Sequence, residues 1–411
     1  MSAIHHAPTA VAPAAPARSA AHILVVHHDA DLYGADQSLL RTLRALKASP
    51  FVPIVCVPHF GPLVDLIRAE GIELHIGPVG KLTRQVMKPL ALPRVAMDML
   101  ASVRFMSKVV GRRQVVLTYT NSVAALGGAL WAKLHRIPRL WHVREIVVAP
   151  KIAERAFPLM LKWLGGWCVC NSHATRQWIV DQQPSLASRS SVVWNGLDDP
   201  AAVGVTEASA FRERLGVAAD EVIVTLVGRI NLWKGQSVLI DAAAALKKRG
   251  PLGARFLIVG DVADGQHHFR EEMLERIRAA GLDGQVLWHP FTPKVDVVWA
   301  ASDIAVAPSI WPEPFGRVAI EAMSHALPVI ATRHGGLAEI VVDEETGLLV
   351  VPGDVESLAS ALARLIADTG LRERLGAAGL MRQRAQFTQV EHDRKLMDLI
   401  QRLSSAIPVA A

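Results

Sequence analysis

Residues 303–325 read DIAVAPSIWPEPFGRVAIEAMSH, which passes from an apolar run through a proline-bounded loop into a helical pattern. The run Asp303–Ala307 predicts a buried strand, and Gly316–His325 predicts a helix. Pro314 disfavours helical backbone at the residue before it, so Glu313 belongs to the loop. A strand, a loop and a helix in this order form the repeating unit of a parallel α/β sheet.

The same unit recurs on both sides of this stretch. The first half has predicted strands at His22–His27, Pro53–Val57, Ile72–Ile76, Val115–Tyr119, Arg139–Val143 and Trp167–Cys170, and predicted helices at Asp36–Ala48 and Asn121–Arg136. The second half adds strands at Val222–Val227, Arg255–Val259, Val286–Trp288, Leu327–Ala331 and Leu348–Val351, and helices at Gln236–Lys248, Phe269–Gly281, Pro293–Ala301 and Val355–Ala367. Continuously apolar runs are typical of parallel strands covered on both faces, so each half is predicted to be a doubly wound, Rossmann-like α/β sheet.

The length of the chain also favours two domains. A single hydrophobic core stops growing at roughly 250–300 residues, and this chain has 411. We expect a disordered Ala/Pro-rich tail over residues 1–20, an N-terminal domain over 21–198 and a C-terminal domain over 199–385. Residues 199–207 read as a linker. A final helix within 386–411 is expected to return to the N-terminal domain.

Cysteine usage and the N-terminus point to the cytoplasm. The three cysteines form an odd set, and the first residues lack the basic start and apolar run of a secretory signal. Cys168 and Cys170 alternate on a predicted strand and lack the usual spacing of zinc ligands. The His27-His28-Asp29 run is likewise not expected to hold a metal. The sequence contains no run of ~18 consecutive apolar residues, so no membrane span is predicted.

One segment is strongly basic. Residues 81–113 contain a single acid, Asp98, and eight cations: Lys81, Arg84, Lys88, Arg94, Arg104, Lys108, Arg112 and Arg113. Apolar residues are interleaved with these cations. Such a block suits an anionic partner, and we expect an anionic membrane surface rather than nucleic acid. A solvated helix face is the alternative interpretation.

The first chemical motif follows the strand Val222–Val227 and reads GRINLWKG over residues 228–235. Gly228 lets the backbone turn close to a ligand. Arg229 and Lys234 place two cations at the end of the strand, beside the start of the next helix. An Arg fork, a Lys point charge and a helix N-terminus together suit a diphosphate.

The second motif is the loop and helix from Pro308 to Met323. Glu313 lies in the loop, and Glu321 lies about 7.5 Å along the helix from its start. The free N–H groups of Phe315 to Val318 lie between the two carboxylates and can hold an anion. An anion cradle flanked by two hydrogen-bond acceptors suits a phosphate that carries a sugar on each side.

These two motifs resemble the large family of retaining, GT-B-fold glycosyltransferases often called family 4, or glycosyl transferases group 1. That family carries two glutamates separated by seven residues, as Glu313 and Glu321 are here. The similarity extends to residues 193–198 (VWNGLD), 298–303 (VWAASD), 335–341 (GGLAEIV) and 346–350 (TGLLV). It covers roughly residues 22–400 and implies a GT-B fold, with acceptor binding in the N-terminal domain and donor binding in the C-terminal domain.

The resemblance also implies roles for individual residues. Glu321 would bind the donor ribose, and Glu313 a hydroxyl of the transferred sugar. Arg229 and Lys234 would hold the diphosphate, helped by the backbone of Phe315, Gly316, Arg317 and Val318. Pro290 and Phe291 would contact the base. In the N-terminal half, Tyr33-Gly34-Ala35-Asp36 resembles a Gly-Gly-x-Glu loop over the phosphates, with Tyr33 replacing the first glycine, and His142 matches a histidine near the donor sugar.

The expected reaction is sugar transfer from a nucleoside diphosphate sugar to an acceptor hydroxyl, with retention at the anomeric carbon. Glu313, His142, Arg229 and Lys234 are the expected catalytic residues, and no metal or other cofactor is expected. The acceptor would be a saccharide, lipid-linked in polysaccharide or glycolipid assembly, at the inner face of the membrane. Alternatives are a glycoside hydrolase, a sugar phosphorylase or nucleotide-sugar epimerase, and a non-catalytic scaffold.

Overall fold

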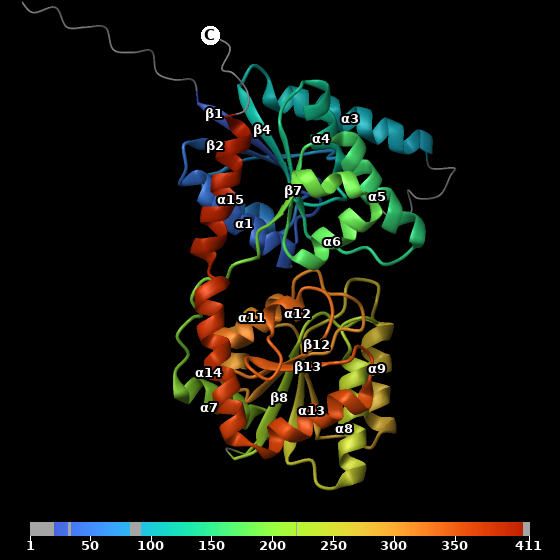
Figure 1. Ribbon diagram of the computed structural model, residues 1–411, viewed down its shortest axis with the longest axis vertical. Coiled ribbons are helices and arrows are strands. Elements are labelled where there is room, and N and C mark those ends of the chain that lie inside the picture. Colours follow the sequence, from blue (N-terminus) through green and yellow to red (C-terminus); the bar gives the residue numbers. More distant parts are fainter. Residues whose placement is uncertain (1–19, 32–33, 83–91, 219, 406–411) are drawn as a thin grey trace, which may run out of the picture.

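The computed structural model describes residues 20–31, 34–82, 92–218 and 220–405. It has two α/β lobes stacked along the long axis of the molecule, each built on a parallel sheet (Figure 1). The expected tail over residues 1–20 lies almost entirely outside the described residues. The GT-B fold, with two Rossmann-like domains, is confirmed.

The first sheet has the order β3-β2-β1-β4-β5-β6-β7. Its strands are β1 Ala21–Val26, β2 Phe51–Val57, β3 Glu73–Ile76, β4 Val115–Thr120, β5 Arg139–Val143, β6 Trp167–Cys170 and β7 Ser190–Val192. Its helices are α1 Gly34–Lys47, α2 Pro62–Ala69, α3 Leu92–Val110, α4 Leu126–Leu134, α5 Lys151–Leu164 and α6 His173–Gln182. Alternate residues of β1 enter different cores: Ile23 and Val25 pack with α1 and α2, whereas Leu24 and Val26 pack with α3 and α4.

The second sheet has the order β10-β9-β8-β11-β12-β13. Its strands are β8 Val222–Val227, β9 Ala254–Val259, β10 Val286–His289, β11 Ile304–Ala307, β12 Val329–Thr332 and β13 Gly347–Val350. Its helices are α7 Val205–Arg214, α8 Gln236–Arg249, α9 His268–Ala279, α10 Val295–Ala300, α11 Arg317–Ser324, α12 Leu337–Ile340 and α13 Val355–Ala367. Since β8 pairs with β11 at the centre, the loops that follow these two strands emerge side by side.

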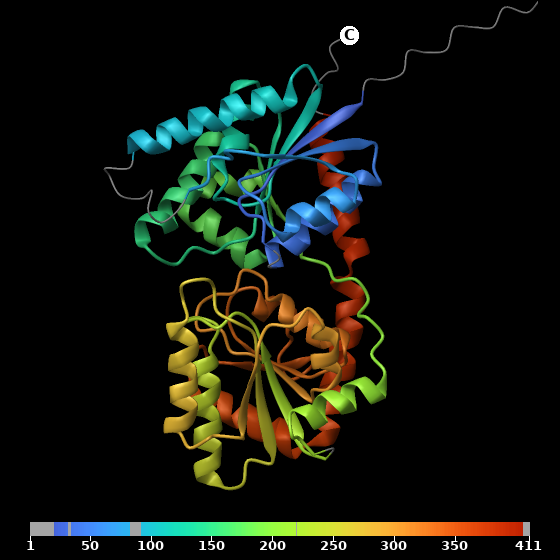
Figure 2. The same ribbon diagram turned by 180° about the vertical axis from the view of Figure 1, so that it is seen from behind.

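Two long helices run along one edge of the molecule, α14 Thr369–Gln386 beside the second lobe and α15 Gln389–Ser404 beside the first (Figure 2). Leu396, Leu399 and Ile400 of α15 are buried in the core of the first sheet. The chain crosses itself between the lobes, where the Leu197 N–H donates to the Phe387 carbonyl and the Gln389 N–H donates to the Leu197 carbonyl, both at 2.9 Å.

Two local expectations were wrong, and one strand was not predicted. The helix expected at Asn121–Arg136 begins only at Leu126, because the preceding turn is held by a bridge between Lys81 and Ala125. Strand β7 reads Ser-Ser-Val and lacks the apolar run that reveals a strand in sequence. The stretch read as a linker already contains the start of α7 at Val205. Among the described residues, no helix has the length and apolar character needed to cross a bilayer.

Candidate functional site

The loops after β8 and β11 are locked together at the carboxyl edge of the second sheet. The Ile310 N–H donates to the Trp233 carbonyl at 2.7 Å. Gly235 has a left-handed φ of 83°, and a Cβ added there would lie 2.0 Å from the Pro308 carbonyl oxygen. Only glycine, which has no Cβ, adopts this left-handed φ and lies so close to the Pro308 carbonyl. The two loops therefore form one rigid unit.

Lys234 and Glu313 form an ion pair within this unit, although they belong to different loops. The side chains are 16% and 10% exposed, so the pair is largely shielded from water. The Ser309 hydroxyl donates to the other carboxylate oxygen of Glu313 at 2.8 Å. The backbone of the loop after β11 is held by a further hydrogen bond, because the Gly336 N–H donates to the Glu313 carbonyl at 2.7 Å.

Helix α11 begins directly after this loop. Gly316, the residue before it, has a φ of 105°, and a Cβ there would lie 2.5 Å from the Leu337 side chain. Arg317 in the first turn forms an ion pair with Glu321 at 3.1 Å. Gly34, at the start of α1 in the first lobe, faces Arg317, whose Cδ would be 3.5 Å from a Cβ at that glycine. The first turn of α11 thus faces the other lobe.

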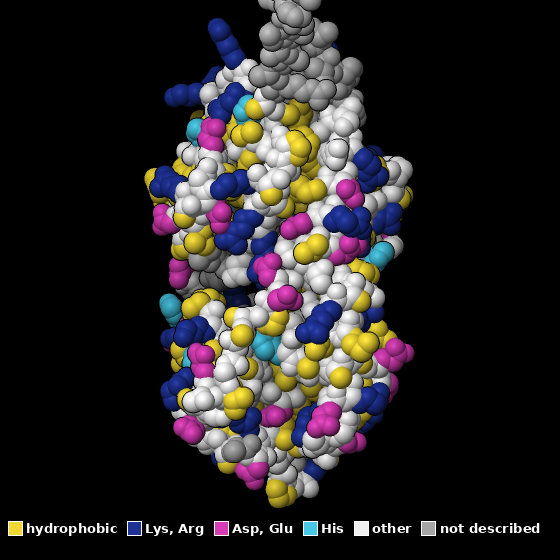
Figure 3. Space-filling model, turned by 90° about the vertical axis from the view of Figure 1, so that its left-hand side faces the viewer, with side chains coloured by type: hydrophobic (Ala, Val, Ile, Leu, Met, Phe, Trp, Pro, Cys, Tyr) yellow, Lys and Arg dark blue, Asp and Glu magenta, His cyan; other side chains and the backbone are white. Residues whose placement is uncertain are grey.

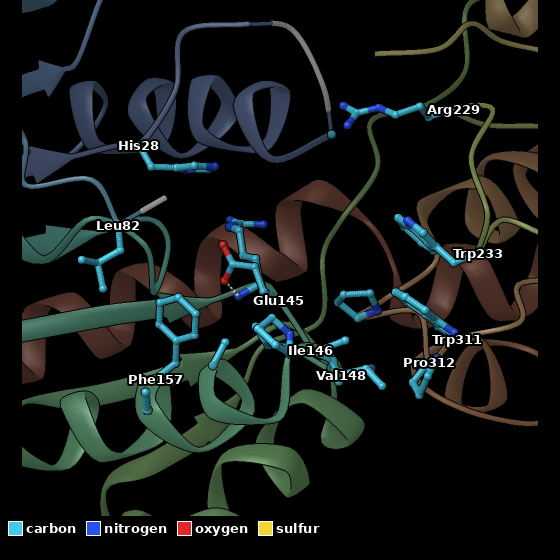
Figure 4. A pocket seen from close by; sticks show the side chains of 18 of the residues that line it. His28, Leu82, Glu145, Ile146, Val148, Phe157, Arg229, Trp233, Trp311 and Pro312 are labelled. Carbon is cyan, nitrogen blue, oxygen red and sulfur yellow. Dashed lines mark hydrogen bonds between the residues drawn. The ribbon is translucent and has the colours of Figure 1, made fainter. Parts of the chain in front are cut away.

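A cavity of about 690 Å³ lies between the lobes (Figure 4). The second lobe contributes Gly228, Arg229, Trp233, Lys234, Trp311, Pro312 and Pro314. The first lobe contributes polar residues His28, Arg144 and Glu145, together with Gly34. A third part of the wall is apolar and is formed by Leu82, by residues 146–150 and by Ala153, Ala156, Phe157 and Met160 of α5.

Several predicted site residues lie elsewhere. His142 is fully buried and does not line the cavity; its Nδ1 is 2.6 Å from the Tyr119 hydroxyl. Burial and the charge of Arg144 lower the pKa of His142 well below its usual value. Phe315 is 3% exposed and packs in the core of the second lobe. Pro290 and Phe291 follow β10 outside the cavity wall, and Phe291 is 63% exposed. Their proposed roles therefore stay predictions.

Arg144 and Glu145 are cavity residues that sequence reasoning did not single out. The Arg144 guanidinium donates to Asn121 at 2.9 Å and to Asn195 at 2.8 Å. Within the part of the chain that the structure describes, no carboxylate lies within ion-pair distance of it. Burial raises the pKa of Glu145, whose carboxylate accepts from the Ser122 hydroxyl at 2.6 Å. Their position directly after the predicted strand Arg139–Val143 was the available signal.

His28 is a further cavity residue. Burial and the neighbouring His27 lower the pKa of His28 to about 4, so its ring is neutral at pH 7. His27 is paired instead with Asp36 at 2.7 Å. Across residues 20–31, 34–82, 92–218 and 220–405, no group of three or more His, Cys, Asp or Glu side chains could hold a metal ion.

The two lobes also meet through Glu339 of α12. Its carboxylate accepts from the backbone N–H groups of His173 and Ala174, at 2.8 and 2.7 Å, and from the Trp194 indole at 2.9 Å. His173 and Ala174 begin α6, so Glu339 satisfies free N–H groups at the start of a helix in the other lobe. The Thr175 hydroxyl adds a bond to the Pro314 carbonyl at 3.1 Å.

Sequence comparison connects this site to a family. Residues 207–381 match the family described as Glycosyl transferases group 1. The D-inositol 3-phosphate glycosyltransferase of Nocardioides sp. is 32% identical over 372 residues, which cover 84% of this chain and 79% of that one. The chain belongs to the glycosyl transferases group 1 family. The enzyme of the same name from Nocardia farcinica is 39% identical over 175 residues, 42% of this chain and 38% of its own length.

Solved structures agree with the fold of this glycosyltransferase. Anabaena Alr3699/HepE in complex with UDP has a TM-score of 0.79 at 24% identity, with 92% of this chain and 99% of that chain covered. WaaG, a glycosyltransferase involved in lipopolysaccharide biosynthesis, has a TM-score of 0.69 at 16% identity, with coverage of 92% and 99%. At these identities the likeness establishes the two-lobed fold.

Proposed function

We propose that the protein is a retaining glycosyltransferase that moves a sugar from a nucleoside diphosphate sugar to a hydroxyl of a lipid-linked saccharide. The observation that carries the proposal is that Arg229 and Lys234 line one wall of the cavity, beside the Pro312 and Pro314 loop that leads into α11. Two cations and a helix N-terminus stabilise the negative charge that develops on a departing diphosphate. Relatives named as glycosyltransferases, and a fold neighbour solved with UDP-glucose, support this donor class.

In the proposed reaction, the bond between the anomeric carbon and the diphosphate oxygen breaks. The acceptor oxygen forms its bond to that carbon on the same face, and its proton passes to the departing phosphate oxygen. Glu313 would orient a hydroxyl of the transferred sugar, and Glu321 would accept from the ribose. Because these carboxylates are already paired with Lys234 and Arg317, they suit hydrogen-bond acceptance better than the general-acid and nucleophile roles of a glycoside hydrolase.

The apolar part of the cavity wall supports an acceptor with an apolar portion. Leu82, Ile146 and Phe157 lie beside Glu145 (Figure 4), so apolar and hydrogen-bonding groups share one wall. A saccharide carried on a lipid has both kinds of surface. Such an acceptor fits a role in exopolysaccharide or glycolipid assembly at the inner face of a membrane.

We also propose that the basic block 81–113 contributes to membrane attraction through α3. Arg94, Arg104 and Lys108 are exposed on that helix beside Met97 and Leu100. The ends of the block are engaged within the protein, since Lys81 pairs with Asp29 at 3.2 Å and Arg113 with Glu73 at 2.6 Å. Arg84 and Lys88 fall outside the described residues. The net attraction is therefore smaller than the formal charge of the block suggests.

The test is a donor screen followed by product analysis. UDP, GDP, UDP-hexoses and GDP-hexoses are each added to the protein. The shift in its melting temperature is measured in the presence of EDTA. The proposal predicts stabilisation by one nucleotide series, and transfer to a lipid-linked saccharide with the anomeric configuration of the donor. Turnover of the donor alone would favour an epimerase, and the absence of nucleotide binding would favour a scaffold; either result contradicts the proposal.

A further inference from the structure

Helix α5 has two chemically different faces. Ala153, Ala156, Phe157 and Met160 point inward and form part of the cavity wall. The outer face is exposed to solvent and carries large apolar side chains together with cations. A surface helix normally buries its apolar stripe against the core and presents polar residues outward. The outward apolar residues of α5 therefore need a partner.

The outer face of α5 consists of six residues. Ile152, Leu159 and Trp163 are 63%, 53% and 62% exposed. Lys151, Arg155 and Lys162 are exposed beside them. At about 100° per residue, all six fall within an arc of about 120°, with the cations along one side and the apolar residues along the other. The apolar side borders Ala156, so it lies next to the face that lines the cavity.

The end of α4 extends this surface. The Lys133 ammonium lies 4.0 Å from the centre of the Trp163 ring and donates to the Trp163 carbonyl at 2.6 Å. Leu134, the next residue, is 63% exposed, and Arg136 is exposed as well. The Trp163 indole is thus held in place with its ring accessible, which is the arrangement of an aromatic side chain at a membrane interface.

The charge of this surface has one sign. Glu154 is the acidic residue of α5; its side chain is 19% exposed and is paired with Lys151 at 2.8 Å. On the opposite edge of the molecule, over α14 and α15, cations and acids are interspersed (Figure 3). Exposed apolar groups among cations, without exposed acid, complement an anionic lipid surface.

We propose that α5, together with the end of α4, is the surface by which the protein docks on an anionic bilayer. The helix lies along the interface, Ile152, Leu159 and Trp163 enter the acyl boundary, and the cations meet lipid headgroups. Because the inner face of the same helix lines the cavity, a lipid-linked acceptor places its saccharide in the site and the adjoining part of its lipid against the apolar cavity wall, while the rest of the lipid stays in the bilayer. The proposal rests on the proposed function for the identity of the acceptor.

The test measures binding of the full chain to vesicles by flotation. Vesicles of phosphatidylglycerol and phosphatidylethanolamine are compared with vesicles of phosphatidylcholine at low salt. The wild type should bind the anionic vesicles. Each cation of α5 replaced by glutamine should lower partitioning about fivefold, and Ile152→Glu with Leu159→Glu should abolish it. Val390→Glu with Met381→Glu is the matched control on α15 and α14, where the residues are 79% and 74% exposed.

Two further measurements make the outcome decisive. Nucleoside diphosphate affinity and thermal unfolding should be unchanged in the α5 variants, which separates docking from the donor site. Quenching of tryptophan fluorescence by lipids brominated on their acyl chains should fall in Trp163→Phe.

Vesicle binding that survives the α5 changes would overturn the proposal, as would binding lost only when Arg94, Arg104 and Lys108 of α3 are replaced. A change of oligomeric state in Ile152→Glu without loss of vesicle binding would mark α5 as a contact between copies and would also overturn it. If the wild type binds nucleotide but no vesicles, the docking proposal fails while the donor assignment stands.

Discussion

Lys234 and Glu313 form an ion pair with one another, although the sequence assigns them to the diphosphate and the transferred sugar respectively. The pair joins the loops after β8 and β11 and is largely buried. A donor must therefore share or exchange these contacts when it binds. The pair also keeps both side chains ordered before the donor arrives, which lowers the entropic cost of binding.

Replacing Lys234 by methionine should affect stability and binding together. The change leaves Glu313 shielded without its cation, so the free energy of unfolding should fall by about 1–3 kcal/mol. Adding Glu313→Gln should recover part of that loss, and a double-mutant cycle by urea unfolding measures the coupling. Nucleoside diphosphate affinity should fall roughly 10- to 150-fold in Lys234→Met and in the double variant, because both lack the Lys234 cation.

The exposed pair of Lys294 and Glu207 is the control for this prediction. Its side chains are 76% and 49% exposed, and Lys294→Met should change stability by less than about 0.5 kcal/mol. Equal effects at Lys234 and Lys294 would mean that the Lys234 pair is no more than an exposed contact.

Gly235 should be intolerant of a side chain. Gly235→Ala combines a left-handed backbone, worth about 1–2 kcal/mol, with a Cβ only 2.0 Å from the Pro308 carbonyl oxygen. We expect a loss of roughly 3 kcal/mol or more in unfolding free energy. Gly284→Ala is the matched control, since its φ is 72° and no atom lies within 4 Å of the added Cβ. Similar losses at both positions would show that the contact with Pro308 contributes nothing.

Glu339 should couple the two lobes. Glu339→Gln keeps the shape but weakens the bonds to the His173 and Ala174 N–H groups, and a lost cap costs about 0.5–2 kcal/mol. Because those bonds cross between lobes, limited proteolysis at the crossing near Leu197 should also become faster. Asp368→Asn is a control within the second lobe, where the carboxylate caps α14 through the Leu371 N–H. Faster proteolysis in both variants would contradict a specific interlobe role.

His392 should make the protein acid-sensitive. Burial and the charge of Arg144 lower the pKa of His392 to about 4, below its usual value of 6.5. Between pH 6.5 and pH 4 the unfolded chain therefore binds more protons than the folded protein. The free energy of unfolding falls as the pH falls through that window, by up to about 3 kcal/mol. His392→Asn can still donate to the Trp194 carbonyl, which accepts from His392 Nδ1 at 2.8 Å, and should flatten this slope. His267→Asn, at an exposed position, should leave it unchanged; urea unfolding at pH 7.5, 6 and 5 provides the comparison.

Much of the fold and part of the site could be predicted from local sequence. The predicted strands end at Val227 and Ala307, and the loops that follow them carry Arg229 and Glu313. Because ligands of open α/β sheets bind beyond the carboxyl ends of strands, these loops could be predicted to form the site. Apolar periodicity located helices such as α1, α8 and α13, whereas α2, α3, α5 and α6 were not among the predicted helices. Both signals depend only on neighbouring residues.

Contacts between distant segments could not be predicted. On β5, Leu140 packs on the face covered by α15, and alternation places His142 on that same face, where its ring lies 6.1 Å from that of His392. Nothing near His142 in sequence shows which face α15 will cover. The pairs Lys234–Glu313 and Glu339–His173 likewise join residues far apart in the chain.

The two glutamates should separate binding from turnover. Glu321 accepts from ribose hydroxyls that are the same in the ground state and the transition state, so Glu321→Gln should weaken the bare nucleoside diphosphate roughly 10- to 150-fold. Glu313 acts on the transferred sugar, so Glu313→Gln should lower turnover. It also frees Lys234 from its partner, and affinity for the bare nucleotide should therefore be unchanged or higher.

Calorimetric titration of the bare nucleoside diphosphate into the wild type, Glu313→Gln and Glu321→Gln tests the donor site most directly. We expect a clear loss of affinity in Glu321→Gln and none in Glu313→Gln. Equal affinity in all three proteins, or an equal loss in both variants, would contradict the placement of the nucleotide at the start of α11.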